Sequence, residues 1–263
     1  MKYLWIIFIF SLNISYANEN RVRLCLENLQ LYPYSTGKEQ TNKKEAGALV
    51  DIIIEAHKKK GIELEIIRRP WKRCLMDTRS GKVDATAAVL WSEERDKIYA
   101  FPKKANKPHP ENYLWSPEYV VITNKASNVR YKDGNLLNHK YGLSAPEGYL
   151  ITSKLISKGI SRGHEFGPSR GVSLVAINRI DGYVIERQIG RYFIAKEKLE
   201  DKLLINKDPF HVDKFYFVFS KSFQQEHSEL AEEIWDNIAM IRNEKGKNLI
   251  DYYFKKDVLS KYL

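Results

Sequence analysis

The stretch between residues 70 and 95 constrains the fold of this chain more than any other. It begins with a predicted short helix whose apolar residues share one face at i, i+3 and i+4 spacing: Trp71, Cys74 and Leu75. Gly81 suits the left-handed conformation in which many helices end. Residues 83–90 then form an almost continuous apolar run, which is typical of a parallel strand covered on both faces. Arg95 follows just beyond the carboxyl end of that strand, where open α/β sheets bind their ligands.

Two short motifs in this stretch have the spacing of a known family. Residues 80–85 are Ser-Gly-Lys-Val-Asp-Ala, and Ser92 and Arg95 form a Ser-x-x-Arg motif. Preceded by Trp71 and its helix, they resemble the bacterial extracellular solute-binding proteins of family 3, in which Thr usually takes the position of Ser92. Weaker similarity extends from about residue 22 to the C-terminus. The resemblance implies an α/β clamshell of the type II periplasmic-binding-protein class. Each of its two lobes would be a mainly parallel sheet with helices on both faces, joined by two crossover hinge strands.

The N-terminus has the pattern of a targeting segment. Lys2 gives it a positive start, residues 4–12 an apolar core, and residues 15–17 a small-x-small cleavage signal. The apolar run is too short to span a bilayer, and no cysteine at the cleavage point offers a lipid anchor. We therefore expect residues 1–17 to be a signal peptide cleaved after Ala17, and the mature chain to be soluble and periplasmic.

Length and charge set the remaining bounds. A chain of 263 residues fits two lobes of ordinary domain size. The formal net charge of +10 would suit a nucleic-acid or membrane surface, but the basic residues are interleaved with acidic ones, as in residues 196–202. The longest purely basic run is residues 58–60. This pattern indicates a solvated surface, so we expect no nucleic-acid partner and a monomeric protein.

The order of predicted strands and helices divides the mature chain into two lobes. Residues 119–123 and 215–220 have the apolar, β-rich composition of strands that cross between them, and two C-terminal helices are predicted over residues 225–242 and 245–254. We expect the following division: residues 18–117 as the first part of lobe one, 118–213 as lobe two, and 214–263 as the return to lobe one.

The chain contains two cysteines, Cys25 and Cys74. Export makes a disulfide chemically feasible, and in a 2-1-3 strand order the helix that carries Cys74 passes over the strand that carries Cys25. Two buried thiols acting as small hydrophobes are the alternative, and both stay open. Two cysteines without clustered histidines cannot complete a tetrahedral metal shell, so we expect neither a metal nor a cofactor.

Arg95 and Glu186 are the main candidates for ligand binding. The guanidinium fork of an arginine matches a carboxylate in two parallel hydrogen bonds, and the resemblance implies that Arg95 holds the α-carboxylate of an amino acid. Glu186 lies five positions after Asp181, where the resemblance implies an acidic residue for the ligand's amino group. The structural alternatives are a surface arginine in the charged run 93–97 and a glutamate that complements the dipole at a helix start.

Aromatic and turn residues complete the candidate set. Tyr34, or Tyr32 in its place, resembles the aromatic residue that covers the ligand after strand one. Gly148 and Tyr149 resemble a helix-start contact whose N–H groups suit an anion. Three further candidates flank the predicted cleft, of which the first is also a core candidate: Trp71, Arg73 and Trp91.

One departure from the family leaves the ligand class open. Between Asp84 and Arg95 the family usually carries hydroxyl side chains, whereas this chain has Ala-Ala-Val-Leu-Trp over residues 87–91. At least two hydrogen bonds to an amino acid are therefore missing, and another small carboxylate, a peptide fragment or an aromatic ligand is an alternative.

We predict a periplasmic binding protein, not an enzyme, that captures a small polar solute such as an amino acid or a related carboxylate. Its partner would be an inner-membrane ABC transporter permease or a sensor. Two alternatives come from other classes. One is a dehydratase-like enzyme on the same fold, with Glu186 as general base, although no histidine lies in a nucleophile or metal motif. The other is an accessory protein whose cleft has lost its ligand.

Overall fold

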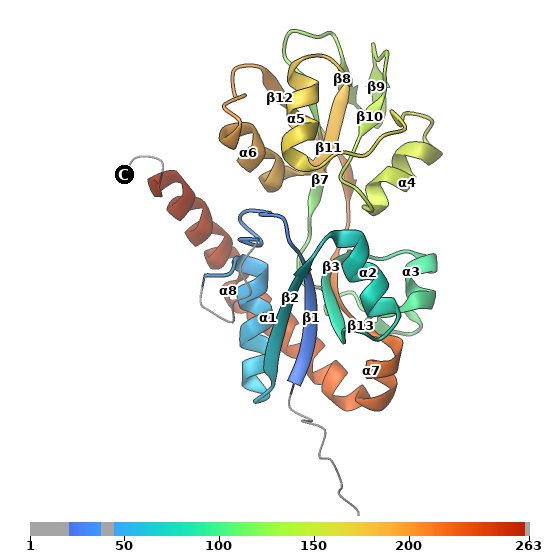
Figure 1. The fold of residues 1–263 in the computed structure, drawn as a ribbon, viewed down its shortest axis with the longest axis vertical. Helices are drawn as coiled ribbons and strands as arrows, with labels where there is room; N and C mark the ends of the chain where they lie inside the picture. The colour runs from blue at the N-terminus through green and yellow to red at the C-terminus, as the bar shows by residue number, and fades with distance from the viewer. Residues whose placement is uncertain (1–20, 38–44, 261–263) are drawn as a thin grey trace, which may run out of the picture.

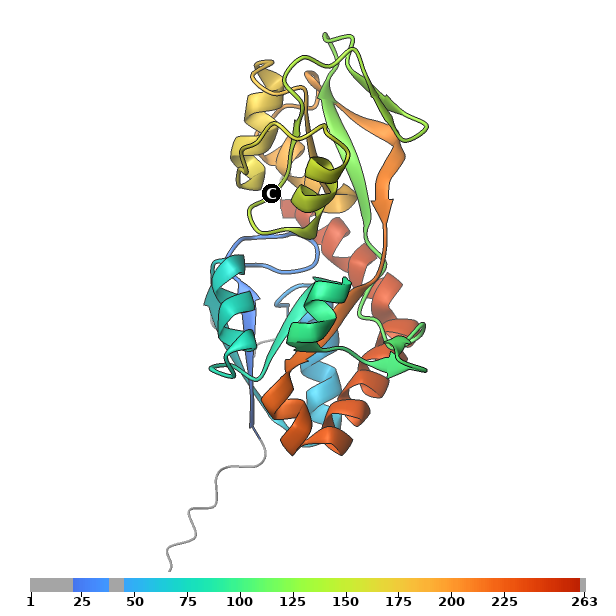
Figure 2. The ribbon, with the colours of Figure 1, turned by 90° about the vertical axis from the view of Figure 1, so that its right-hand side faces the viewer.

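The computed structural model describes residues 21–37 and 45–260. The chain forms two α/β lobes stacked end to end, as two perpendicular views show (Figures 1 and 2). The predicted signal peptide lies outside the described residues. Mixed α/β architecture and two lobes agree with the predicted fold class.

Lobe one is built on a five-stranded sheet. In spatial order it contains β2 (Glu63–Arg69), β1 (Arg21–Glu27), β3 (Ala85–Leu90), β13 (Phe215–Ser220) and β4 (Tyr99–Ala100). The first three strands are parallel, which confirms the 2-1-3 order, while β13 runs antiparallel to β3. The carboxyl ends of β1 and β3 therefore meet at the same edge of the sheet.

Two helices join these parallel strands: α1 (Ala48–Lys59) and α2 (Trp71–Arg79). Residues such as Leu49, Ile52 and Ile53 place a buried stripe of α1 against the sheet, as the helical spacing predicts. Pro70 caps the start of α2 with φ of −53°, close to the value that a proline ring imposes. The short helix α3 (Glu93–Ile98) follows β3.

Lobe two holds a four-stranded sheet. In spatial order its strands are β10 (Leu143–Ser144), β11 (Gly182–Glu186), β7 (Glu118–Asn124) and β12 (Leu203–Val212), covered by α4 (Leu150–Ser157), α5 (Pro168–Ala176) and α6 (Arg187–Lys196). Only β10 and β11 pair in parallel; β7 is antiparallel to both β11 and β12. The expectation of a mainly parallel sheet is wrong for this lobe, because β7 enters it from the hinge, β12 leaves it towards the hinge, and the two are neighbours.

The hinge consists of the two chain segments that enter and leave lobe two, seen side by side in Figure 2. One leads into β7, and the other joins β12 to β13. An isolated bridge between Trp115 and Phe215 ties the segments together just below the lobe boundary. Two small hairpins lie outside the main sheets: β5 (Lys103–Lys104) with β6 (Lys107–Pro108), and β8 (Arg130–Lys132) with β9 (Asn135–Leu137).

The chain ends in α7 (Lys221–Glu226) and α8 (Ser228–Ser260), which pack on lobe one. The prediction of two helices with a break near residue 244 is wrong. Gly246 lies in the helix, and a Cβ there would come within 3.0 Å of the Trp115 ring, so the glycine allows a close approach and does not end the helix. No helix in the described part of the chain has the length and hydropathy needed to cross a membrane.

Candidate functional site

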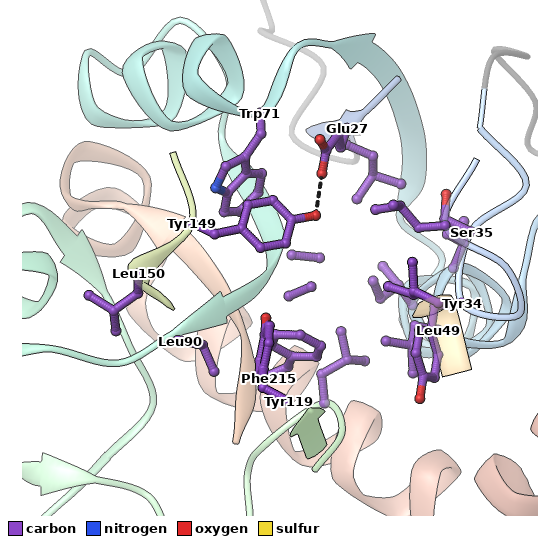
Figure 3. Close-up of a pocket in the computed structure, with 18 of the residues that line it drawn as sticks. Glu27, Tyr34, Ser35, Leu49, Trp71, Leu90, Tyr119, Tyr149, Leu150 and Phe215 are labelled. Atoms are coloured by element: carbon purple, nitrogen blue, oxygen red, sulfur yellow. Dashed lines mark hydrogen bonds between the residues drawn. The ribbon is translucent and has the colours of Figure 1, made fainter. Parts of the chain in front are cut away.

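A cavity of about 80 Å³ lies between the lobes, at the carboxyl ends of β1 and β3 (Figure 3). Its walls are mainly aliphatic and aromatic side chains: Leu26, Leu31, Leu49, Val50, Ile53, Trp71, Ala87, Ala88, Leu90, Leu114, Tyr119, Tyr149, Leu150, Ile189 and Phe215. Tyr34, Ser35, Glu27 and Arg95 add polar groups. Of the predicted site residues, the structure thus brings Arg95, Tyr34, Trp71 and Tyr149 together around one space.

Arg95 reaches this cavity from α3, the short helix that follows β3. Ser92 caps the helix by accepting a hydrogen bond from the Arg95 backbone N–H at 3.2 Å, which is why the chain turns into a helix at once. The guanidinium donates to the carbonyl of Leu90 at 3.1 Å and, across the lobe boundary, to that of Gly148 at 3.4 Å. Burial lowers the pKa of this guanidinium from its ordinary value. Within the described residues it forms no ion pair with a carboxylate.

Glu27, at the carboxyl end of β1, lines the same cavity but was not predicted. Its Oε2 accepts a hydrogen bond from the Tyr149 hydroxyl of lobe two at 2.8 Å, the dashed line in Figure 3. Burial raises the pKa of its carboxyl to about 7, although the bond from Tyr149 acts in the opposite direction. A signal was present in the sequence: an acidic residue ends a predicted strand of the same parallel sheet that delivers Arg95.

Glu186 stands at the end of β11 and starts α6. Its Oε2 accepts the backbone N–H groups of Gln188 and Ile189 at 2.8 and 3.0 Å, and its Oε1 accepts the Tyr34 hydroxyl of lobe one at 3.0 Å. The side chain is therefore a helix cap, as its structural alternative predicted. It is buried and does not border the cavity. Burial raises the pKa of this carboxyl to about 7.

Tyr34 and Tyr32 follow β1 but differ in their surroundings. The Tyr34 ring borders the cavity, while its hydroxyl contacts Glu186. Tyr32 lies outside the cavity, where its hydroxyl donates to the carbonyl of Tyr253 in α8 at 2.6 Å and its ring packs 5.5 Å from that of Tyr192 in lobe two. Tyr34 is thus the aromatic residue of this loop that faces the candidate site.

Gly148 and Tyr149 form a second contact between the lobes. The Trp71 indole donates to the Gly148 carbonyl at 3.2 Å, and the Trp71 and Tyr149 rings pack edge to face, 6.2 Å apart. Gly148 has φ of +75°, and a Cβ there would lie 2.7 Å from a carbon of Lys72, so no larger residue fits. Its N–H donates to the Glu165 carboxylate at 3.2 Å, so this donor is already used.

Arg73 and Trp91, the other two candidates, are not among the cavity-lining residues. Arg73 extends from α2 and pairs with Asp77 at 3.1 Å. Trp91 is partly buried against a smaller apolar cluster of lobe one. Both remain predictions for a ligand that extends beyond the cavity.

A disulfide fixes the strand that carries Glu27. Cys25 and Cys74 are bonded, with their Cα atoms 5.3 Å apart, so of the two alternatives the structure contains the disulfide. It ties β1 directly to α2, which also carries Trp71. Two walls of the cavity are thereby held at a fixed distance.

Chemically, this arrangement can hold an anion and exclude water from an apolar body. No histidine or cysteine is among the cavity-lining residues, and the described part of the chain contains no cluster of side chains able to hold a metal ion. Among the described residues that line the cavity, the partly buried guanidinium of Arg95 is the one permanent cation.

Comparison with known proteins identifies the sequence and the fold. The family model described as bacterial extracellular solute-binding proteins, family 3, matches residues 27–256. None of the curated proteins is similar to this chain in sequence. Among solved structures, a mutant of ArgBP from T. maritima is 17% identical, with a TM-score of 0.68 over 90% of this chain and 96% of that one.

Two further structures show the same fold. The amino acid ABC transporter substrate-binding protein AbpA from Streptococcus pneumoniae, bound to L-arginine, is 17% identical, with a TM-score of 0.68 over 90% of this chain and 95% of that one. A histidine kinase sensor domain with similarity to periplasmic binding proteins is 15% identical, with a TM-score of 0.70 over 89% of this chain and 95% of that one. At identities this low, the structural similarity shows the fold alone. The ligand has to be inferred from the geometry of the cavity.

Proposed function

Because the chain belongs to the bacterial extracellular solute-binding proteins of family 3, we propose that it captures a small carboxylate solute, of the amino-acid type or a relative, in the cavity between its lobes. The observation that carries this proposal is the position of Arg95. Its guanidinium is partly buried beside an apolar cavity, and its hydrogen-bond partners among the described residues are two uncharged backbone carbonyls. A buried cation without an anionic partner is costly, and a ligand carboxylate would supply that partner.

Closure of the lobes supports the same role. Arg95 belongs to lobe one, and the carbonyl of Gly148 that it contacts belongs to lobe two. A carboxylate bound to Arg95 would therefore lie at the boundary that closes around it. Hinge closure of this kind couples occupancy of the cavity to the shape that a membrane partner recognises.

The relatives suggest how such a solute would be used. AbpA is described as an ABC transporter substrate-binding protein, and another structural neighbour is a sensor domain of a histidine kinase. We propose that this chain is exported to the periplasm after cleavage behind Ala17 and delivers its solute to an inner-membrane transporter or sensor. The family and the structural neighbours are described as binding proteins or sensors, which favours binding over dehydratase-like catalysis.

Replacement of Arg95 tests this proposal. We expect Arg95→Ala to weaken carboxylate binding by about 100-fold, since charge-assisted hydrogen bonds contribute roughly 1.5–3 kcal/mol each. Titration calorimetry and thermal shifts over a panel of amino acids and small carboxylates would measure the change, and circular dichroism would verify folding. Arg191→Ala, an exposed arginine on α6, is the matched control. Unchanged affinity in Arg95→Ala would contradict the proposed role.

A further inference from the structure

We infer that the solute is a carboxylate with a mainly apolar body and no ammonium group beside its carboxyl, and not an α-amino acid. This inference rests on the proposed function, since it assumes that Arg95 holds the carboxylate. It follows from which polar groups line the cavity and which of them already form hydrogen bonds within the protein.

The first step concerns Glu186, the acidic residue that the resemblance assigns to an amino group. Its carboxyl accepts three hydrogen bonds from within the protein: from two backbone N–H groups of α6 and from the hydroxyl of Tyr34. Glu186 is only 3% exposed and does not line the cavity, whereas Tyr34, whose hydroxyl it accepts, does. A ligand ammonium could reach Glu186 only by displacing the Tyr34 ring, and the displacement would leave the tyrosine hydroxyl without its acceptor.

The second step concerns the wall formed by β3. Ala87, Ala88 and Leu90 line the cavity there, and none of their side chains can accept a hydrogen bond. An ammonium bound near Arg95 needs several hydrogen-bond acceptors, because burying a charge without partners costs far more free energy than burying a neutral polar group without partners. The side chains of this wall supply none.

The third step concerns the body of the ligand. Leu49, Ile189 and Phe215 line the cavity with apolar surface, and Trp71 and Tyr149 add aromatic rings. Burial of an aliphatic or aromatic group against such walls is favourable by about 25 cal/mol per Å². Together with one guanidinium, this lining suits an apolar anion.

Glu27 is the remaining acid, and its environment fits the same ligand. Its Oε2 accepts the Tyr149 hydroxyl, so the protein already uses one of the two carboxyl oxygens for a contact between the lobes. Burial raises the pKa of this carboxyl to about 7, so much of it is uncharged at neutral pH. A neutral carboxyl needs no cation from the ligand.

Matched pairs of ligands test the inference on the whole mature protein. L-Leucine is compared with isocaproate, and L-phenylalanine with hydrocinnamate, each pair differing only in the ammonium group. We expect the two deaminated acids to bind at least about tenfold more tightly in calorimetry, a difference of about 1.4 kcal/mol. Preference for the amino acids, or tight binding of L-arginine, would overturn the inference and leave the proposed function intact. Failure of every carboxylate in the panel to bind would overturn the proposed function itself.

Variants of Tyr34 provide a second, independent measurement. Tyr34→Ala opens a route to Glu186, and we expect it to shift the preference at least about tenfold towards the amino acid of each pair. Tyr34→Phe keeps the covering ring without its hydroxyl, and we expect it to retain the preference for the deaminated acids. Circular dichroism verifies that both variants fold. An unchanged preference in folded Tyr34→Ala would show that the Tyr34 ring does not determine the ligand class.

Discussion

Two carboxyls near the lobe boundary, the partly buried Glu27 in lobe one and the buried Glu186 in lobe two, occupy equivalent positions but have different roles. Each ends a strand of its sheet, and each accepts a hydrogen bond from a tyrosine of the opposite lobe: Tyr149 for Glu27 and Tyr34 for Glu186. In both cases burial raises the pKa of the carboxyl to about 7.

The difference lies in what else each carboxyl does. Glu186 also caps α6 and is sealed from the cavity, so its oxygens are committed to the fold. Glu27 has Tyr149 as its hydrogen-bond donor and borders the cavity, and a disulfide two residues before it fixes its strand. Position at a strand end therefore does not by itself identify a ligand-binding acid, because the internal hydrogen bonds of Glu186 commit its carboxyl to the fold.

The largest effect is expected from releasing the strand that carries Glu27. The Cys25–Cys74 disulfide closes a loop with a sequence separation of 49. Replacing both cysteines by alanine should lower the free energy of unfolding by about 4 kcal/mol, because the unfolded chain regains the entropy of that loop. Urea denaturation would measure it. Dithiothreitol should reproduce the loss in the wild type and have no effect on the double variant, and a loss below about 1 kcal/mol would contradict the expectation.

A smaller effect is expected when the carboxyl of Glu186 is removed. Glu186→Ala deletes the cap of α6 and leaves the buried Tyr34 hydroxyl without its acceptor, so the free energy of unfolding should fall by about 3 kcal/mol. Glu27→Ala removes one hydrogen bond and should cost about 1 kcal/mol. Equal losses in denaturant titrations of the two variants would show that both carboxyls serve the fold to the same extent.

Parts of the fold could be predicted from the sequence alone, and other parts could not. The strands and helices of lobe one followed from apolar runs and helix boundaries, which are local properties of the chain, whereas the role of Arg95 came from the family resemblance. The antiparallel sheet of lobe two depends on which strands become neighbours at the hinge, and spacing along the chain does not determine that. The uninterrupted α8 depends on Trp115, a residue far away in sequence that packs against Gly246.

The same limit applies to the candidate site. Glu186 was predicted from the family resemblance, and Glu27 at the end of a strand had a comparable signal, but only the packing of the two lobes determines that Glu27 lines the cavity and Glu186 does not. The bonds from Tyr34 and Tyr149 span 152 and 122 residues of sequence. No periodicity or motif encodes such contacts, because they form only when both lobes are complete.

The last prediction uses pH to compare the two carboxyls. Burial raises the pKa of Glu186 in the folded state from its ordinary value of 4.5 to about 7, so between these values the folded chain binds more protons than the unfolded one. The stability that this carboxyl contributes is fully present below pH 4.5 and is lost as the pH rises through 7. The unfolding free energy of Glu186→Gln minus that of the wild type should therefore increase by about 2 kcal/mol between pH 5 and 7.

Glu27→Gln should change in the same direction and by a similar amount, because burial also raises the pKa of this carboxyl to about 7. Differences between variants are needed because His57 acts with the opposite sign: burial lowers its pKa to about 4, so its contribution is lost as the pH falls from 6.5. The contribution of His57 is the same in each variant and in the wild type, so it cancels when the wild-type unfolding free energy is subtracted. A flat difference for Glu186→Gln across this range would mean that the Glu186 carboxyl is ionised in the folded protein at pH 5. A flat difference for Glu27→Gln would mean the same for Glu27.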